Sequence, residues 1–274
     1  MRYLRDAGLD AELLLFADES EHFLPENDTW EIEKWIKFIR KTNLNNSEKG
    51  FLSSSVDKIL NELGGYDFYI GCGISPAYLY KSGIKLDIMI PYAYGIEFFG
   101  AHKFSIFNPV REIVFQAAKM YQQRGIRKNC KLCITTDYSS KQKASLDLLG
   151  IKTITSGIPM VYINEMPEQE TLDAKLKDVI RMFKSSDIVL FSHVSHKWKK
   201  IPRDWLLDYK RNQVLIEGFA EYVKCKELNN PLLVLFEYGY DVNNSKILIK
   251  ELRIEKYVLW LPLMSRKELM VLLD

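Results

Sequence analysis

The feature that most constrains the fold of this chain is a regular alternation of short, continuously apolar segments with amphipathic helical segments. The clearest apolar segment is "PLLVLFEYG" at 231–239, which is apolar or aromatic at nearly every position around one Glu. Strands that are apolar on both faces are typical of parallel sheets covered by helices on both sides. The expected fold class is therefore α/β, built on parallel sheets.

Further segments of both kinds follow one another along the chain. Strands are predicted at 11–16, 66–72, 86–95, 130–137, 152–164, 187–195 and 256–264. Helices are predicted at 1–8, 29–41, 53–63, from 75, and at 110–126, 139–151, 171–186, 211–226, 243–254 and 265–274. In the helix at 29–41, Ile32, Trp35, Ile36 and Ile39 form one apolar stripe, as the helical period requires.

The strands fall into two groups separated by the acidic connection "NEMPEQETLDAK" at 164–175. We expect two doubly wound parallel-sheet domains, at 1–183 and at 184–274, each incomplete. The chain opens with a helix that no strand precedes, and it closes with a helix that no strand follows.

The composition is that of a globular protein, with 47% hydrophobic and 27% charged residues in a chain of 274. A formal net charge of +2 gives no case for a nucleic-acid partner. No run of about 18 or more apolar residues occurs, so no membrane-spanning helix is expected.

The four cysteines and four histidines do not predict a metal site. "CKLC" is the one motif-like spacing, but zinc needs a second ligand pair, and none of the histidines supplies one at the required spacing. A redox pair would open a helix, whereas "KLCITT" is typical of a strand. We expect buried structural thiols in a reducing compartment.

Two strand-to-helix turns in the first domain could carry chemistry. "GCGISPAYL" offers close backbone approach and a helix start, with Ser75 as the expected N-cap before Pro76. "IPYAYGIEFFG" gathers Tyr92, Tyr94 and Glu97, which suit sugar hydroxyls and sugar rings. A capped tight turn and a surface carboxylate with packed tyrosines are the structural alternatives.

In the second domain the densest basic stretch spans residues 193–211 and includes Lys197 and Lys210. It lies between a strand and a helix, where a diphosphate would meet cations and helix N–H groups, although a solvated loop explains it equally well. The next strand ends at Glu237 and Gly239, and "WLPLM" ends the last strand before Ser265 and Glu268, which form a capping box.

Two stretches together carry a family resemblance. "GGYDFYIGCGISPAYLYKSGIKLDIMIPYAYGIEFF" and, later, "KRNQVLIEGFAEYVK" with "LLVLFEYGYDVNNSKILIKELRIEKYVLWLPLMSRKEL" resemble family-4-type glycosyltransferases of the GT-B fold, closest to those of bacterial surface-polysaccharide assembly. The resemblance implies two Rossmann-like domains facing a cleft, with the acceptor held at 1–183 and a nucleotide-sugar donor at 184–274. It implies retaining transfer without a metal or other cofactor.

The resemblance also implies residue roles. "YGIEF" matches the stretch where many relatives carry His-Gly-x-Asp beside the transferred sugar, so Tyr94 and Glu97 are the expected catalytic residues. Lys210 matches a lysine that contacts donor phosphate, and Lys197 stands near the place of a missing arginine. The expected donor site further contains Glu237, Gly239 and Leu263 of "LPLM", and the expected acceptor site contains Ser75 and Tyr92.

The implied partners are a nucleotide-sugar donor and a glycan or lipid-linked sugar acceptor, in the cytoplasm and peripheral to the inner membrane. Relatives begin with a strand and a Gly-rich loop and continue beyond Asp274 into two donor-binding glutamates. The resemblance therefore predicts a fragment with impaired transferase activity. The alternatives are a non-catalytic sugar- or nucleotide-binding remnant and a Rossmann-type protein for another nucleotide-bearing ligand.

Overall fold

The structure is a computed structural model of the chain. It describes residues 1–19, 24–91, 109–135, 146–156, 162, 164–165, 172, 174–198, 210–225 and 230–273. The chain divides into two compact units, Met1–Tyr162 and Ile163–Asp274. The assignment of 1–183 to an acceptor and 184–274 to a donor stays a prediction.

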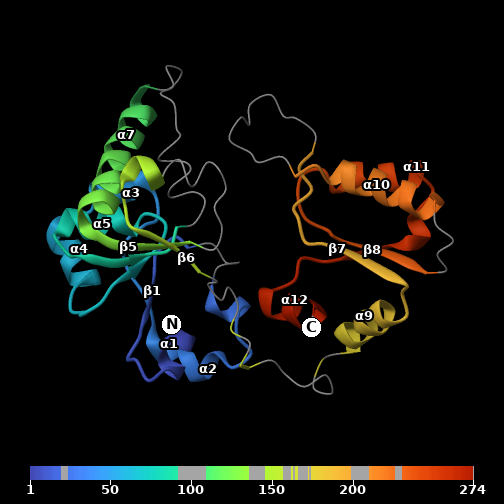
Figure 1. The fold of residues 1–274 in the computed structure, drawn as a ribbon, viewed down its shortest axis with the longest axis horizontal. Coiled ribbons are helices and arrows are strands. Elements are labelled where there is room, and N and C mark those ends of the chain that lie inside the picture. The colour runs from blue at the N-terminus through green and yellow to red at the C-terminus, as the bar shows by residue number, and fades with distance from the viewer. Residues whose placement is uncertain are drawn as a thin grey trace. The chain divides into compact units, whose positions relative to one another are not determined.

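In its described residues, the first unit contains six strands in two sheets, part of which Figure 1 labels. The strands are β1 (Leu13–Leu15), β2 (Ile39–Lys41), β3 (Ile70–Gly71), β4 (Leu86–Met89), β5 (Cys130–Thr135) and β6 (Thr153–Thr155). The helices are α1 (Arg2–Asp6), α2 (Ile32–Trp35), α3 (Glu48–Ser53), α4 (Val56–Leu63), α5 (Ser75–Ser82) and α7 (Pro109–Arg124). One sheet has the order β1-β2 and the other the order β3-β4-β5-β6, and every pairing is parallel.

In the described residues of the second unit, one sheet has the order β7-β8-β9, which is also parallel throughout. Its strands are β7 (Ile188–Ser192), β8 (Pro231–Phe236) and β9 (Val258–Leu261), and its helices are α9 (Ala174–Lys184), α10 (Asn212–Cys225), α11 (Val242–Glu251) and α12 (Arg266–Leu273). Figure 1 shows α10 and α11 on one side of the sheet and α9 and α12 on the other. Every residue of the central strand β8 is buried.

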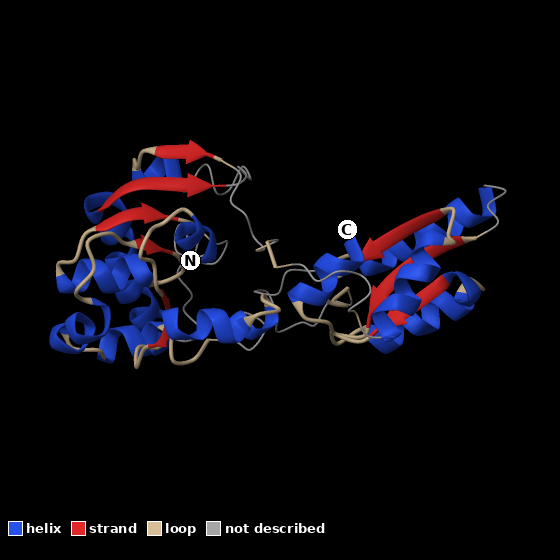
Figure 2. Cartoon of the chain, turned by 90° about the horizontal axis from the view of Figure 1, so that it is seen from below, coloured by secondary structure: helices blue, strands red, loops and turns tan. Residues whose placement is uncertain are grey.

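Each unit has its own hydrophobic core. In the first unit, Tyr78, Phe51 and Leu86 are among the fully buried members of a cluster that joins α3, α4, α5 and α7 to the sheet. In the second unit, Phe219 and Leu235 belong to a cluster between α10, α11 and the sheet. Both units combine helices with parallel strands, and Figure 2 shows the helices and strands of the chain by colour, so the predicted α/β class with parallel sheets is confirmed.

The helix predicted at 29–41 is wrong over most of its length. Helix α2 spans only Ile32–Trp35, a 3-10 turn covers Ile36–Phe38, and β2 covers Ile39–Lys41. Trp35 is buried, but Ile36 is 51% exposed, so the apolar stripe is not one buried face. Strand pairing of β2 with β1 therefore overrides the helical period there.

Among the described residues, no helix combines the length and the apolar character needed to cross a membrane. Part of the helix predicted at 139–151 and the tail of the strand predicted at 86–95 lie outside the described residues.

Candidate functional site

The candidate site is formed by the loops that follow the three strands of the second unit. These loops begin after Ser192, Phe236 and Leu261, at the carboxyl ends of β7, β8 and β9. Carboxyl ends of parallel strands meet at one edge of the sheet, where open α/β sheets bind ligands. Four of the predicted donor residues lie on these loops, namely Lys197, Glu237, Gly239 and Leu263.

The loops after β7 and β8 are joined through their backbones at His196. The His196 N–H donates to Tyr238 O at 2.9 Å, and the Asp241 N–H donates to His196 O at 2.9 Å. Gly239 lies between these two bonds with φ +111°, and a Cβ on it would come within 2.5 Å of both the N and the O of His196. The close approach and the positive φ therefore both require glycine at this position.

The start of α10 is attached to the same loop. The Lys210 N–H donates to Lys197 O at 2.9 Å. The Lys197 N–H donates to Asn212 Oδ1 at 3.3 Å, and Asn212 Nδ2 donates to Val194 O at 3.4 Å. The backbones of Lys197 and Lys210, both predicted from the basic stretch 193–211, are thus neighbours at the N-terminal end of α10.

Two tyrosines lie near the lysines of this corner, which is formed by Lys197 and Lys210 at the start of α10. Lys197 Nζ lies 5.8 Å from the ring centroid of Tyr240. Burial raises the pKa of the Tyr238 hydroxyl, while a hydrogen bond with the Ser195 backbone and the nearby charge of Lys210 act in the opposite direction. Lys197 therefore lies beside Tyr240, and the charge of Lys210 acts on Tyr238.

A buried hydrogen-bonded network links the loop after β7 to α11 and to the residue before it. His196 Nδ1 lies 2.7 Å from Ser245 Oγ, which also accepts a bond from Trp198 Nε1 at 2.8 Å. The Trp198 N–H donates to Asp241 Oδ2 at 2.8 Å. Burial lowers the pKa of His196 to about 4, so the ring is neutral at physiological pH. The sequence reasoning missed this network, because no local pattern joins residues 49 positions apart.

Glu237 and Leu263 lie at the same edge of the sheet but are engaged differently. Lys246 Nζ of α11 donates to Glu237 Oε1 at 2.6 Å, so this carboxylate is already paired. Leu263 is 59% exposed just after β9. The predicted capping box follows it, since the Ser265 N–H donates to Glu268 Oε2 at 2.7 Å and the Glu268 N–H donates to Ser265 Oγ at 3.4 Å.

The predicted residues of the first unit are not assembled into a described site. Tyr92, Tyr94 and Glu97 lie outside the described residues. Ser75 is described, but its predicted capping role is wrong, because Ile74 is the N-cap and Ser75 is the first residue of α5. Its Oγ is buried and has no hydrogen-bond partner in the part of the chain that the structure describes.

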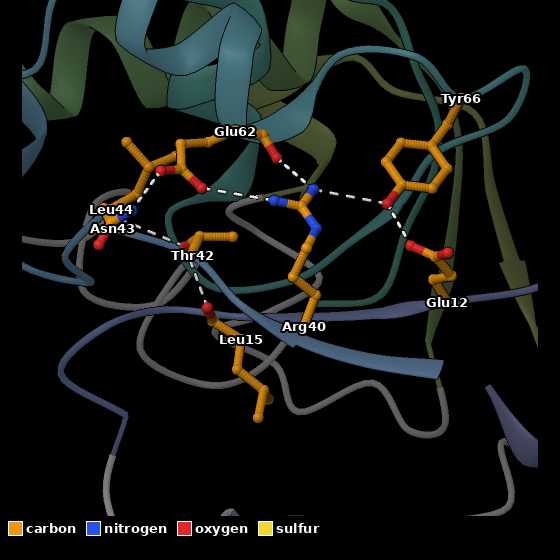
Figure 3. Close-up of polar contacts among 8 residues, drawn as sticks. All are labelled: Glu12, Leu15, Arg40, Thr42, Asn43, Leu44, Glu62 and Tyr66. Atoms are coloured by element: carbon orange, nitrogen blue, oxygen red, sulfur yellow. Dashed lines mark hydrogen bonds and ion pairs between the residues drawn. The ribbon is translucent and has the colours of Figure 1, made fainter. Parts of the chain in front are cut away.

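The first unit also contains a polar cluster that no motif predicted (Figure 3). The Arg40 guanidinium donates to Glu62 O at 2.6 Å and to Tyr66 Oη at 3.5 Å, and the Tyr66 hydroxyl donates to the Glu12 carboxylate. Glu12 and Tyr66 precede β1 and β3, so the cluster lies at the amino ends of these strands. Ligands bind at the opposite ends in such sheets, which favours a structural role.

Burial raises the thiol pKa of Cys72, Cys130 and Cys133, the three cysteines whose surroundings the structure describes. Cys130 and Cys133 lie on β5 as predicted, and burial raises the pKa of Cys133 to about 12. The expectation of buried thiols is wrong for Cys72, which is exposed just after β3. Across the described ranges, no group of three or more His, Cys, Asp and Glu side chains could hold a metal ion.

Compared with known proteins, the chain matches no family model, and no curated protein is significantly similar to it.

Proposed function

We propose that the carboxyl edge of β7, β8 and β9 binds the diphosphate of a nucleotide sugar, and that the protein is a retaining glycosyltransferase whose donor side is this unit. The observation that supports the proposal most directly is the backbone hydrogen bond of 2.9 Å between Lys210 N and Lys197 O, which brings two lysines together at the N-terminal end of α10. Helix N-termini and ammonium groups both favour phosphate oxygens.

The proposed chemistry uses this corner to stabilise a leaving group. A hydroxyl oxygen of the acceptor sugar forms a bond to the anomeric carbon of the donor. The bond from that carbon to the diphosphate breaks, its electron pair stays on the diphosphate, and the departing diphosphate oxygen takes the proton of the attacking hydroxyl. Lys197 and Lys210 would neutralise the negative charge that develops there. Each supplies a compact point charge rather than the two-pronged contact of an arginine.

The remaining expected residues take their roles within the same proposal. Gly239 lets the loop after β8 approach His196 closely, and Leu263 presents an exposed loop after β9. On the acceptor side, Tyr94 and Glu97 are proposed as catalytic residues, and Ser75 and Tyr92 as acceptor contacts. The proposed acceptor is a glycan or lipid-linked sugar, reached at the surface of a membrane, and no metal is invoked.

Calorimetric titration of the intact chain with UDP and with GDP tests the donor site. We expect one of the two to bind. We expect Lys210→Ala and Lys197→Ala each to weaken that binding about tenfold, which corresponds to the loss of about 1.4 kcal/mol from one charge-assisted contact. Lys224→Ala is the matched control, because Lys224 is an exposed lysine of α10 that pairs with Glu221.

Binding that is unaffected by the loss of Lys210 would contradict the proposed site. A thermal shift with NAD alone would favour a different nucleotide-bearing ligand. Incubation with UDP- and GDP-sugars, followed by assay of released sugar, separates transfer or hydrolysis from binding without turnover, which is the outcome for a non-catalytic remnant.

A further inference from the structure

His196 connects the loop after β7 to neighbouring parts of the second unit. Its backbone N–H and C=O make the hydrogen bonds to Tyr238 and Asp241 that join this loop to the loop after β8. The next residue, Lys197, accepts from the Lys210 N–H at 2.9 Å, which joins the same loop to the start of α10. The position of residues 196 and 197 therefore decides whether these connections form.

The ring of His196 has one nitrogen with a hydrogen bond and one without. Nδ1 lies 2.7 Å from Ser245 Oγ on α11, and the same oxygen accepts from Trp198 Nε1 at 2.8 Å. Nε2 is buried and has no hydrogen-bond partner within the described ranges. His196 as a whole is 0% exposed, and its ring packs against that of Trp260 on β9 with 5.2 Å between the centroids. Solvent therefore does not reach Nε2 in this conformation.

These surroundings accommodate a neutral ring better than a charged one. A protonated imidazole has N–H donors at both nitrogens. Ser245 Oγ can accept from Nδ1, but the donor at Nε2 would be buried without an acceptor. An unpaired neutral polar atom already costs free energy, and an unpaired charged donor costs more. A proton on the ring therefore favours a conformation in which Nε2 reaches water.

The charged groups near His196 do not reverse this preference. Burial lowers the pKa of His196 to about 4, and the charge of Asp241 acts in the opposite direction. The Asp241 carboxylate already accepts from the Trp198 N–H and from Asn244 Nδ2, each at 2.8 Å. The other ionisable side chains on the neighbouring segments are Lys197, Lys210, Glu237, Tyr238, Tyr240 and Lys246. Of these, the one carboxylate, that of Glu237, is paired with Lys246 at 2.6 Å.

We propose that His196 is a positioning residue for Lys197, and that protonation of its ring opens the segment 195–198 and separates Lys197 from Lys210. The protonated ring turns outward to reach water. Because the ring is fully enclosed and the backbone of the same residue carries the bonds to Tyr238 and Asp241, the segment moves with it. At neutral pH the segment is closed and the two lysines are neighbours. The proposal does not depend on which anion, if any, the lysines bind.

The size of the effect follows from the two conformations of the ring. In the opened segment the ring is in water and has its ordinary pKa of 6.5, whereas in the closed segment its pKa is about 4. The opened conformation therefore takes up the proton more readily as the pH falls through 6.5. Its population relative to the closed one should rise about 30-fold between about pH 7.5 and about pH 5.

The test measures amide exchange of the intact chain by NMR at these two pH values. Each rate is divided by the intrinsic rate of that amide at the same pH, so the ordinary pH dependence of exchange cancels. We expect the protection of the His196, Asp241 and Lys210 amides to fall about 30-fold. At both pH values it should be lower than the protection of the β8 amides, because local opening needs less free energy than unfolding of the unit.

Variants identify the group that titrates. His196→Gln and His196→Asn take up no proton, so the protection of the Asp241 amide should be the same at both pH values. Asn places an amide near the position of Nδ1, where it can still pair with Ser245. His193→Gln is the matched control. His193 lies on the same loop but outside 195–198, its Nε2 is also buried without a partner among the described residues, and its ring packs 4.7 Å from that of Phe236.

His193→Gln should therefore keep the pH dependence of the wild type. Circular dichroism checks that each variant retains its fold. In the wild type, which needs no substitution, the NMR signals of the His196 ring should titrate well below the ordinary pKa of 6.5.

Three outcomes would overturn the proposal. The first is that the His196 and Asp241 amides are as well protected as those of β8, which would mean that the segment opens only when the unit unfolds. The second is that their protection is the same at both pH values in the wild type. The third is that His196→Gln keeps the pH dependence while His193→Gln removes it. Each readout reports on the segment itself, so this proposal and the proposed function fail separately.

Discussion

Single residues hold the candidate site together, and Gly239 is the clearest of them. Its φ of +111° and the nearness of the His196 backbone leave no room for a side chain. Sequence reasoning selected Gly239 together with Lys197 and Lys210, because each lies between a predicted strand and the following helix. The same reasoning could not find Ser245 or Asp241, since their partners become neighbours only when the sheet has formed.

Gly239→Ala should destabilise the second unit by about 2 kcal/mol, since it combines a disfavoured φ with a backbone collision. It should also weaken nucleotide binding, because His196 and Lys197 must shift. Gly218→Ala is the control, because a Cβ at Gly218 on α10 meets open space. There alanine should stabilise by up to about 1 kcal/mol. Urea unfolding measures the free energy of unfolding of both variants. An equal change in Gly239→Ala and Gly218→Ala would contradict the prediction.

The neutral, buried His196 predicts a loss of stability in mild acid. Its pKa in the folded chain is lowered to about 4 from the ordinary 6.5, so the unfolded chain binds the proton more readily as the pH falls through 6.5. The folded state should lose about 2 kcal/mol between about pH 7.5 and pH 5.

Urea unfolding of wild type and His196→Gln at both pH values measures this loss. His193, whose pKa burial also lowers, remains in both proteins, so its contribution cancels from the difference between them. An identical pH dependence in wild type and variant would show that His196 is not the group responsible.

At the scale of elements, the sequence predicted those with a clear apolar pattern or a cap. Helix α4 is capped by Ser55, whose Oγ accepts from Lys58 N at 3.1 Å, and the buried strand β8 matches its apolar run. Strand β2 was mistaken for helix, because Ile39 fits a helical stripe as well as a strand and only pairing with β1 decides between them. Local pattern alone could not resolve this.

The capping box predicts that Ser265→Ala frays the first turn of α12. The serine hydroxyl oxygen accepts a hydrogen bond from the Glu268 N–H, and the Glu268 carboxylate accepts one from the Ser265 N–H. Loss of the capping box should lower the free energy of unfolding by about 1 kcal/mol and accelerate amide exchange at the start of α12. Ser185→Ala, at an exposed serine just after α9, is the control and should leave exchange in α12 unchanged. Unchanged exchange after Ser265→Ala would mean that the box contributes no stability.

At the scale of the whole molecule, two separate cores imply two unfolding events. The alternation of elements was enough to predict the α/β class, but the sequence analysis grouped the strands only by domain and did not predict two sheets in the first unit. The split of the first unit into the sheets β1-β2 and β3-β4-β5-β6 became visible only from the pairing. Calorimetry should show two transitions, and UDP or GDP, whichever binds, should raise only that of the second unit.

Gly239→Ala should lower the same transition and leave the other in place. A single transition that both the nucleotide and this substitution shift would contradict the independence of the two cores.

The strand order has a consequence for how the protein is made. In each sheet, every strand pairs with the strand nearest to it in sequence: β1 with β2, each member of β3-β4-β5-β6 with the next, and each member of β7-β8-β9 with the next. During synthesis on the ribosome, each of these strands can therefore pair with the strand made just before it or just after it. Pairing between neighbours in sequence avoids the closure of still longer loops, and the N-terminal unit can become compact while the second is still being synthesised.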